Sequence, residues 1–543
     1  MKRRRRRGYG RLQVWDLILW SGALLVLLPV LAVATSWWRP VDPAVTTHLR
    51  ETLLGEYIGG SLALLMGVLL VAGSLGVSLA WMVARYRFPG DRLLAIALWL
   101  PLTVPGYVLA FVYSGLLEYS GPVATALRAR GLNFDTDIRN FTGAVLVLSF
   151  ALYPYVYLIM RTAFQSQGAR FLEAGQSLGR DGPGLFFRLI LPLSRPWLLT
   201  SLALVGMETM ADFGAVSILG YDTFTTGIYK AWYGFFSPVT AARLASLLVV
   251  FVLTILLLEQ WAERRKAFHQ RPETALLPRR RPAPLRGWLM TAWGVLIVSL
   301  GFLVPLVQLL LWSVDSLQDY GWPAWLGPAL GSSVVLGVLV GLAVVAGSFF
   351  LTMGERLSRV PPLVRRIPAR LAMMGYALPG AVLAVGLYQA AGWFDQLRLA
   401  FIPDDQQTES WLLTGSVVLL VGGLALRFMA VGGAAVGSAA RRLSPHLEEA
   451  AAGLGAGAGT ILGCIHAPLL RPAMIAGFVL ACGDALKEMP LTLMTRPFGW
   501  DTLSVKVFEF TSEGDWQQAA VPGLTLMLTG LVIGLVFRRG LEQ

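Results

Sequence analysis

Long uninterrupted apolar stretches dominate the pattern of hydrophobic and polar positions along this chain. A helix needs about 20 apolar residues to cross the core of a bilayer, and the sequence supplies such runs repeatedly. The runs lack the period-2 alternation that a membrane β-barrel requires. The pattern predicts an all-α polytopic membrane protein with about twelve transmembrane helices, at residues 15–36, 58–83, 93–117, 143–162, 196–218, 241–261, 289–313, 332–353, 371–393, 411–432, 472–495 and 518–537.

Composition and the distribution of charge agree with a membrane protein. The 543 residues are 55% hydrophobic and only 14% charged, which is too little charge for the surface of a soluble protein of this size. If Met1–Arg7 is cytoplasmic and twelve spans alternate, cytoplasmic segments hold most of the 45 Lys and Arg, whereas external loops hold 9. This bias predicts that both termini are cytoplasmic. The net charge of +13 is therefore explained by the orientation of the chain in membrane lipid, and we expect no nucleic acid as a partner.

A basic, proline-rich segment divides the spans into two groups of six. Residues 262–288 contain eight basic residues and four prolines, which predicts a cytoplasmic linker over 263–288. The flanking parts, 1–262 and 289–543, are predicted to form two lobes. Both lobes contain an even number of spans, so they would share one orientation around an axis along the membrane normal.

The two lobes are predicted to be repeats because short patterns recur in the same order. Glu173-Ala174-x4-Gly179 recurs as Glu449-Ala450-x4-Gly455, and Pro192 recurs as Pro468, each 276 residues later. Two further patterns recur at offsets of 274 and 279: Pro105-Gly106 as Pro379-Gly380, and Gly220-Tyr221-Asp222-Thr223 as Gly499-Trp500-Asp501-Thr502.

The recurring Glu-Ala pattern lies in two predicted cytoplasmic loops, 165–195 and 437–471. A glutamate is favoured in the first turn of a helix by the helix dipole. A glycine ends such a helix and lets the backbone turn, and a proline is well tolerated where the next helix begins. Each loop is therefore predicted to form a short helix that projects into the cytoplasm. An ordinary amphipathic connector is the alternative, but two copies at matching places argue against it.

These loops resemble the EAA loop of ATP-binding-cassette importer permeases. The resemblance rests on Glu173, Ala174, Gly179 and Pro192 in the first copy and on Glu449, Ala450, Gly455 and Pro468 in the second. Gly175 departs mildly from the pattern, because the third position is usually alanine. The resemblance implies a MetI-like fold in a bacterial cytoplasmic (inner) membrane. It also implies two partners, a cytoplasmic ATPase, expected in two copies, and a periplasmic or lipid-anchored substrate-binding protein.

The sequence itself offers no catalytic centre. It contains no G-x-x-x-x-G-K-[ST] phosphate-binding loop, so ATP would be used by the partner subunit, and no cofactor is expected on this chain. Cys464, Cys482 and the four histidines are scattered without metal-ligand spacing. We therefore expect a transport subunit rather than an enzyme, with no fixed metal site.

Two segments carry a closer resemblance, to the iron(III) transport permeases. Glu208–Val216 with Thr223–Trp232 is similar to their first half, and Lys487–Leu493 with Arg496–Leu503 is similar to their second. The likeness extends over essentially the whole chain, which implies iron(III) as cargo. Thiamine, polyamine and oxyanion importers share the architecture and stay open as alternatives. An ion-coupled secondary transporter is the alternative from another class, although it has no use for two EAA loops.

Ionisable residues recur inside two predicted spans. Glu208 and Asp212 are four residues apart, as are Asp484 and Glu488, and the two pairs are 276 residues apart. Each pair shares one helix face, and its first member lies about 18 Å along the helix if that begins at the Arg-Pro dipeptide. That is near the midplane of a core ~30 Å thick.

Two interpretations of these residues remain open. In the first, the four carboxylates and Lys487 line the translocation pathway, where charged groups usually face water, and favour a hard cation. In the second, they are structural and cap broken helices or pair with Lys487, Arg427 or Arg243.

Overall fold

The computed structural model describes residues 14–41, 43–132, 137–166, 182–264, 279–358, 360–401 and 412–541. Within these ranges the regular structure is helical, and no β-strand is present. Nine helices among the described residues are long and apolar enough to cross a membrane, and two further spans are broken by bends of 90° and 69°. The predicted all-α membrane fold is confirmed.

The predicted span at 371–393 is the one that no such helix matches among the described residues. It falls on α18 (Pro362–Ala372), a 3₁₀ turn η7 (Met374–Ala377) and α19 (Gly380–Leu399). Because α18 carries three arginines, it is too polar to count as part of an apolar span.

Contacts divide the chain into two compact units that differ from the two sequence halves. Unit 1 comprises residues 1–40, 324–505 and 532–543, and unit 2 comprises 41–323 and 506–531. The first helix of each half packs in the unit of the other half. α1 (Val14–Ala34) packs against α17 (Leu326–Leu357), α18 and α19 in unit 1. In unit 2, α15 (Pro284–Val298) packs against α4 (Asp91–Ala97), and α16 (Val304–Tyr320) packs against α5 (Gly106–Leu117).

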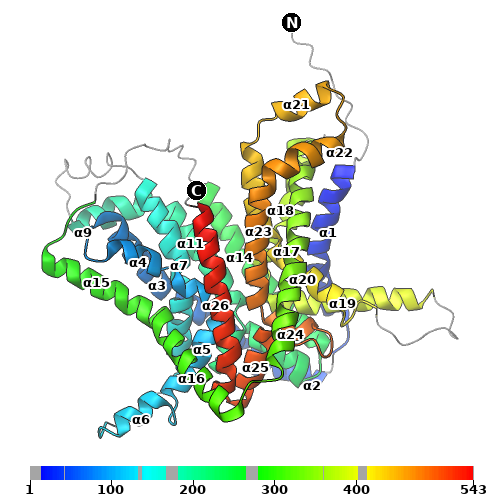
Figure 1. The fold of residues 1–543 in the computed structure, drawn as a ribbon. Helices are drawn as coiled ribbons and strands as arrows, with labels where there is room; N and C mark the ends of the chain where they lie inside the picture. The colour runs from blue at the N-terminus through cyan, green and yellow to red at the C-terminus, as the bar shows by residue number, and fades with distance from the viewer. Residues whose placement is uncertain are drawn as a thin grey trace. The chain divides into compact units, whose positions relative to one another are not determined.

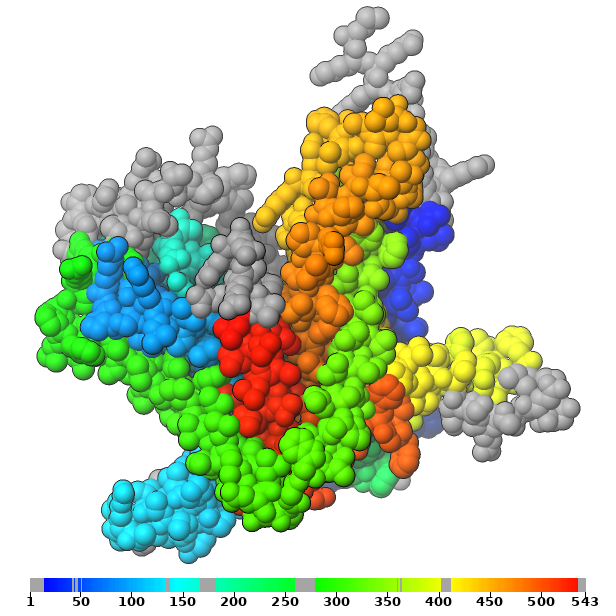
Figure 2. All heavy atoms as spheres, viewed as in Figure 1, coloured from blue at the N-terminus to red at the C-terminus, as the bar shows by residue number. Residues whose placement is uncertain are grey.

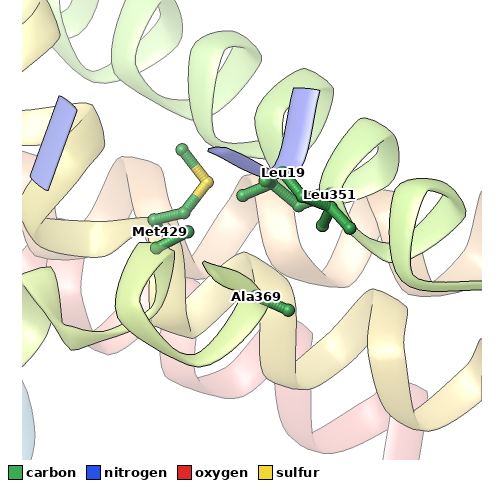
Figure 3. Packing of buried hydrophobic residues seen from close by; sticks show 5 residues of the cluster. Leu19, Leu351, Ala369 and Met429 are labelled. Carbon is green, nitrogen blue, oxygen red and sulfur yellow. The ribbon is translucent and has the colours of Figure 1, made fainter. Parts of the chain in front are cut away.

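Unit 1 is built around α17, α20 (Val417–Arg442) and α23 (Ala467–Lys487), which pack pairwise (Figure 1). Glycines permit the close approach: a Cβ added at Gly432 would lie 2.6 Å from the Ser348 hydroxyl, and one at Gly341 would lie 2.6 Å from the Cys482 sulfur. Small residues serve this purpose in membrane helices, where packing rather than hydrophobicity drives association. Figure 3 shows how α1 joins the unit, with its Leu19 packed beside Leu351, Ala369 and Met429.

Unit 2 is built around α3 (Leu54–Arg85), α7 (Phe141–Ser166) and α11 (Arg195–Ala211), and α11 also packs against α14 (Pro238–Arg264). A Cβ at Gly76 of α3 would collide with Val156 of α7, so glycine sets the separation here too. Among the described residues, the other helices and helical turns are η1 (Thr35–Trp38), α2 (Pro43–His48), η2 (Leu49–Leu53), η3 (Leu100–Thr103), α6 (Pro122–Arg128), α9 (Gly182–Leu185), η4 (Phe186–Ile190), α10 (Leu191–Leu193), α12 (Gly214–Ile218), α13 (Phe224–Tyr229), η5 (Lys230–Gly234), η6 (Ser299–Leu303), α21 (His446–Gly453), α22 (Ala458–Ile461), η9 (Leu462–His466), α24 (Pro490–Thr495), α25 (Leu503–Glu513) and α26 (Trp516–Leu541).

The predicted repeat is visible in the bounds of the helices. α3 and α17 each contain 32 residues, and α7 and α20 each contain 26. The helical path between α4 and α5 breaks at Pro105 (φ −59°, ψ 143°), and the path between α18 and α19 breaks at Pro379 (φ −57°, ψ 143°). This extended conformation cannot continue a helix, so both recurring Pro-Gly dipeptides mark breaks in the helical path, and the one at Pro105 lies within a candidate membrane span.

Candidate functional site

The second Glu-Ala loop forms the predicted short helix, α21, which has Glu448 and Glu449 in its first turn. Glu449, the glutamate of the motif, has a side chain that is 75% exposed and lies 3.1 Å from His446. Beyond the helix, Gly455 has a φ of +84°, a conformation that glycine adopts without strain. Ala450 is exposed as well. In Figure 2 the surface of α21 (gold, near the top) lies on the outside of unit 1.

The neighbouring glutamate, Glu448, attaches α21 to the long helices of unit 1. Its Oε1 forms an ion pair with Arg356 Nε at 2.5 Å and lies 3.0 Å from His466 Nε2. Arg356, in the last turn of α17, also donates to the carbonyls of Ala440 and Leu443. Burial acts to raise the pKa of Glu448, but the hydrogen bond and charge of Arg356 outweigh it and hold that pKa below its usual value. Sequence reasoning missed these three side chains.

The two motif prolines follow equivalent backbone features. A π-helical turn, η9, precedes Pro468, which lies in the first turn of α23. The corresponding turn η4 precedes Pro192 in α10, and the two turns are 276 residues apart. The first copy then bends by 69° between α10 and α11. Glu173, Ala174 and Gly179 of the first motif lie outside the described residues.

Asp212 closes a break in the helical path of unit 2. α11 ends at Ala211, and the Asp212 Oδ1 accepts hydrogen bonds from the N–H groups of Ala215 (3.0 Å) and Val216 (3.2 Å) at the start of α12. The Thr225 hydroxyl donates to the Asp212 carbonyl at 2.6 Å. A carboxylate that accepts the free N–H groups of a helix start is a helix cap. We call residues 212–216 the Asp212 turn.

Glu488 closes the equivalent break in unit 1, where α23 ends and α24 begins. Its carboxylate accepts hydrogen bonds from the N–H groups of Leu491 and Thr492, each at 3.0 Å. The Ser504 hydroxyl donates to the Glu488 carbonyl at 2.9 Å. Glu488 is 6% exposed and also forms an ion pair with Arg427 at 2.9 Å. We call residues 488–492 the Glu488 turn.

The remaining predicted pathway residues lie near these turns. Glu208 is one helical turn before Asp212 in α11, Asp484 is one turn before Glu488 in α23, and Lys487 ends α23. All three are partly exposed. Asp212 and Glu488 therefore show the capping that the structural interpretation expects, and Glu488 pairs with Arg427, one of its three predicted partners. Within the described ranges, no group of three His, Cys, Asp or Glu side chains could hold a metal ion.

Comparison with known proteins gives a consistent picture. Residues 74–266 match the family described as the binding-protein-dependent transport system inner membrane component. The chain is 24% identical to the Fe(3+)-transport system permease protein FbpB 2 of Haemophilus influenzae over 88% of each chain. It is 27% identical to the sulfate transport system permease protein CysT of Salmonella typhimurium over 37% of this chain and 68% of that one. It is 29% identical to the molybdenum transport system permease protein ModB of Haemophilus influenzae over 38% of this chain and 91% of that one.

Proposed function

We propose that this chain is the permease subunit of an ATP-binding-cassette importer. The premise is that residues 74–266 match the family described as the binding-protein-dependent transport system inner membrane component. A separate ATPase supplies the energy, and a substrate-binding protein delivers the cargo. The observation that carries this proposal is α21, a short exposed helix fastened to the helices of unit 1. We further propose that both termini are cytoplasmic and that two ATPase copies dock, one at each Glu-Ala loop.

The attachment of α21 suggests how ATP hydrolysis reaches the membrane. An ATPase that contacts Glu449 and Ala450 would move α21, and the contacts of Glu448 with Arg356 and His466 would pass this motion to α17 and the start of α23. α23 contains 21 residues, about 30 Å of helix, and ends at the Glu488 turn. A displacement of α21 would therefore be transmitted along α23 to the Glu488 turn. This connection supports a mechanism of alternating access.

We propose that each of the two breaks lines the translocation pathway. Asp212 and Glu488 hold the turns through backbone hydrogen bonds, whereas Glu208, Asp484 and Lys487 contact the cargo. Ionisable side chains inside a membrane protein usually face an aqueous path or a polar partner. Neutral variants at Glu208 and Asp484 should therefore lower uptake without lowering expression, and unchanged uptake by the double variant Glu208→Gln/Asp484→Asn would remove these residues from the pathway.

The proposed cargo is iron(III). The support is the extent of the likeness, since the iron relative matches 88% of each chain while the sulfate and molybdenum relatives match less than two fifths of this one. Thiamine, a polyamine or an oxyanion is the alternative cargo for the same class. The deciding experiment is uptake by proteoliposomes that contain the permease, its ATPase and its binding protein, with iron(III), thiamine, a polyamine, sulfate and molybdate compared side by side.

The same proteoliposomes test the coupling helix. Glu449→Ala should abolish most ATP-driven uptake while the free energy of unfolding stays unchanged, because this side chain is exposed. His446→Ala is the matched control, since it removes the neighbour of Glu449 and leaves the motif intact. Full uptake by Glu449→Ala would contradict the coupling role, and uptake driven by an ion gradient without ATP would favour a secondary transporter.

A further inference from the structure

Unit 1 contains a polar cavity that the proposed coupling and gating do not use. Its volume is about 530 Å³, within the range of ligand sites, and it is lined by Arg39, Tyr388, Gln389, Gly392, Trp393, Gln396 and Thr414. These residues come from the segment after η1, from the second half of α19 and from the segment before α20. α19 (yellow) projects to the right in Figures 1 and 2.

Buried polar groups in this cavity lack partners within the described chain. Gln389 is 8% exposed, and neither its Oε1 nor its Nε2 forms a hydrogen bond. Buried polar groups in folded proteins are nearly always hydrogen-bonded, because leaving them unpaired costs free energy. The cavity therefore needs an incoming group to complete it.

The surrounding structure holds the polar groups of the cavity in place. Asp395 is completely buried, and its carboxylate accepts hydrogen bonds from the N–H groups of Leu412, Leu413 and Thr414, at 3.0 to 3.3 Å. These bonds fix the backbone that carries the Thr414 hydroxyl. On the other side, the Arg39 guanidinium lies 5.5 Å from the centre of the Trp393 ring, a cation–π contact that orients it.

The chemistry of these groups favours an acidic peptide segment. A guanidinium binds a carboxylate through paired hydrogen bonds, and the Gln389 N–H group is a further donor. The Gln389 Oε1 needs a donor in return, which a backbone N–H supplies but a bare carboxylate does not. The volume also exceeds that of a single carboxylate side chain, so an acidic residue together with its backbone fits the cavity.

The position of the cavity identifies the face of the membrane on which this segment would lie. Thr414 precedes the first turn of α20 and α21 follows its last turn. α20 contains 26 residues, which is about 39 Å of helix, so the cavity and the coupling helix lie at opposite ends of a membrane-crossing helix. If the ATPase contacts α21, the cavity opens on the side where the binding protein delivers cargo.

We propose that this cavity receives an acidic residue of the substrate-binding protein, with Arg39 binding its carboxylate and Gln389 completing the hydrogen bonds. The inference rests on the proposed function, which supplies a binding protein at that face. The cavity of about 400 Å³ in unit 2 differs in kind. Its Glu118 and Asp515 already accept hydrogen bonds from Trp516 and Gln518, so these groups do not call for a partner.

The test uses the permease–ATPase complex in lipid nanodiscs with the binding protein of the same transport system. The measured quantity is the binding-protein concentration that gives half-maximal stimulation of ATP hydrolysis. Arg39→Glu should raise it by ~30-fold or more, the effect of losing one partner of a buried charge pair, and should leave basal hydrolysis unchanged. Arg398→Glu, on the same helix as Gln389 but outside the cavity, is the matched control for long-range electrostatics and should shift it far less.

Two more variants separate docking from folding. Gln389→Leu removes two unpaired polar atoms, so it should raise the melting temperature of the permease and at the same time weaken docking. A merely structural role would move both quantities in the same direction. Gly392→Trp should fill part of the cavity that Gly392 lines, whereas Gly392→Ala should behave as wild type, because a Cβ there meets nothing within 4 Å.

The outcomes distinguish this proposal from the one on which it rests. The docking site would be overturned, and the importer function left intact, if the binding protein stimulated ATP hydrolysis at the wild-type concentration in all three variants, Arg39→Glu, Gln389→Leu and Gly392→Trp. A wild-type complex that hydrolyses ATP but answers to no binding protein would overturn both.

Discussion

The Asp212 turn of unit 2 and the Glu488 turn of unit 1 each cap a break between two helices, and they do so with equivalent hydrogen bonds. In each, a membrane helix stops, a carboxylate accepts N–H groups three and four residues later, and a hydroxyl from the following segment donates to the carbonyl of the acidic residue. A broken helix leaves N–H groups that lipid cannot satisfy, so the repeated caps explain why both halves keep an acidic residue there.

The two turns differ in how the charge of the carboxylate is balanced. Glu488 is buried and paired with Arg427. Asp212 is partly exposed, and the described residues contain no ion-pair partner for it. The position in α7 that corresponds to Arg427 is Ala151, 276 residues earlier. Backbone N–H groups are therefore the described partners of the Asp212 carboxylate, whereas the Glu488 carboxylate has a cation as well.

The largest expected effect comes from removing that cation. Arg427→Met should destabilise the protein by about 3–5 kcal/mol, because it leaves Glu488 charged and unpaired in a buried site. The measurement is the free energy of unfolding in mixed micelles. The double variant Arg427→Met/Glu488→Gln should recover most of the loss, and a single variant as stable as wild type would show that the ion pair does not distinguish the two turns.

Neutralising the two caps should show the same asymmetry on a smaller scale. Glu488→Gln should cost less, about 1.5–3 kcal/mol, the range for hydrogen bonds to charged groups, because the Arg427 side chain that it leaves unpaired is more exposed than the Glu488 side chain, 12% against 3%. Asp212→Asn should cost less than about 1 kcal/mol, because asparagine caps helices as well as aspartate does. Equal losses in the two unfolding titrations would mean that Asp212 has a charged partner after all.

Gly106 and Gly380 lie next to the Asp212 and Glu488 carboxylates, so substitutions at these glycines compare how tightly the two turns are packed. A Cβ at Gly380 would meet the Arg427 guanidinium, the Glu488 carboxylate and Pro490. A Cβ at Gly106 would meet its nearest neighbour, an Asp212 oxygen, at an ordinary 3.5 Å. Gly380→Ala should therefore cost about 1–3 kcal/mol, as overpacking does, and Gly106→Ala should be nearly neutral. The free energies of unfolding of the two variants test this order, and the reverse order would contradict it.

The sequence predicted the features of the fold that depend on hydrophobicity alone, such as where a helix lies along the chain. It did not predict the features that depend on which helices pack together. The apolar runs located the membrane helices, and the offset of 276 located both caps. The same runs did not reveal that α1 packs with α17, α18 and α19, because lipid and neighbouring helices offer an apolar face similar surroundings. The Pro-Gly dipeptides were recognised as repeats, but their role as breaks in the helical path emerged only from the backbone.

The candidate site divides in the same way. The motif predicted the short helix with Glu449 in its first turn, since the start of a short loop helix is a local property. It missed the attachment through Glu448, because Arg356 lies 92 residues away in sequence and only tertiary packing brings them together. Arg427 appeared among the partners considered for Glu488, yet composition and spacing could not choose among three basic residues.

A small expected effect concerns two buried serines, one in each unit, that bind the backbone next to the residue whose hydroxyl donates to each turn. Ser61 accepts a hydrogen bond from the Phe224 N–H at 3.0 Å in unit 2, and Ser333 accepts one from the Leu503 N–H at 2.8 Å in unit 1. Both serines are 2% exposed. Ser61→Ala and Ser333→Ala should each lower the free energy of unfolding by about 1 kcal/mol, the usual net contribution of such a hydrogen bond. The two losses should be similar because no charge is involved. If the Ser333 variant alone were costly, the difference between the turns would extend beyond Arg427 to the whole backbone framework of unit 1.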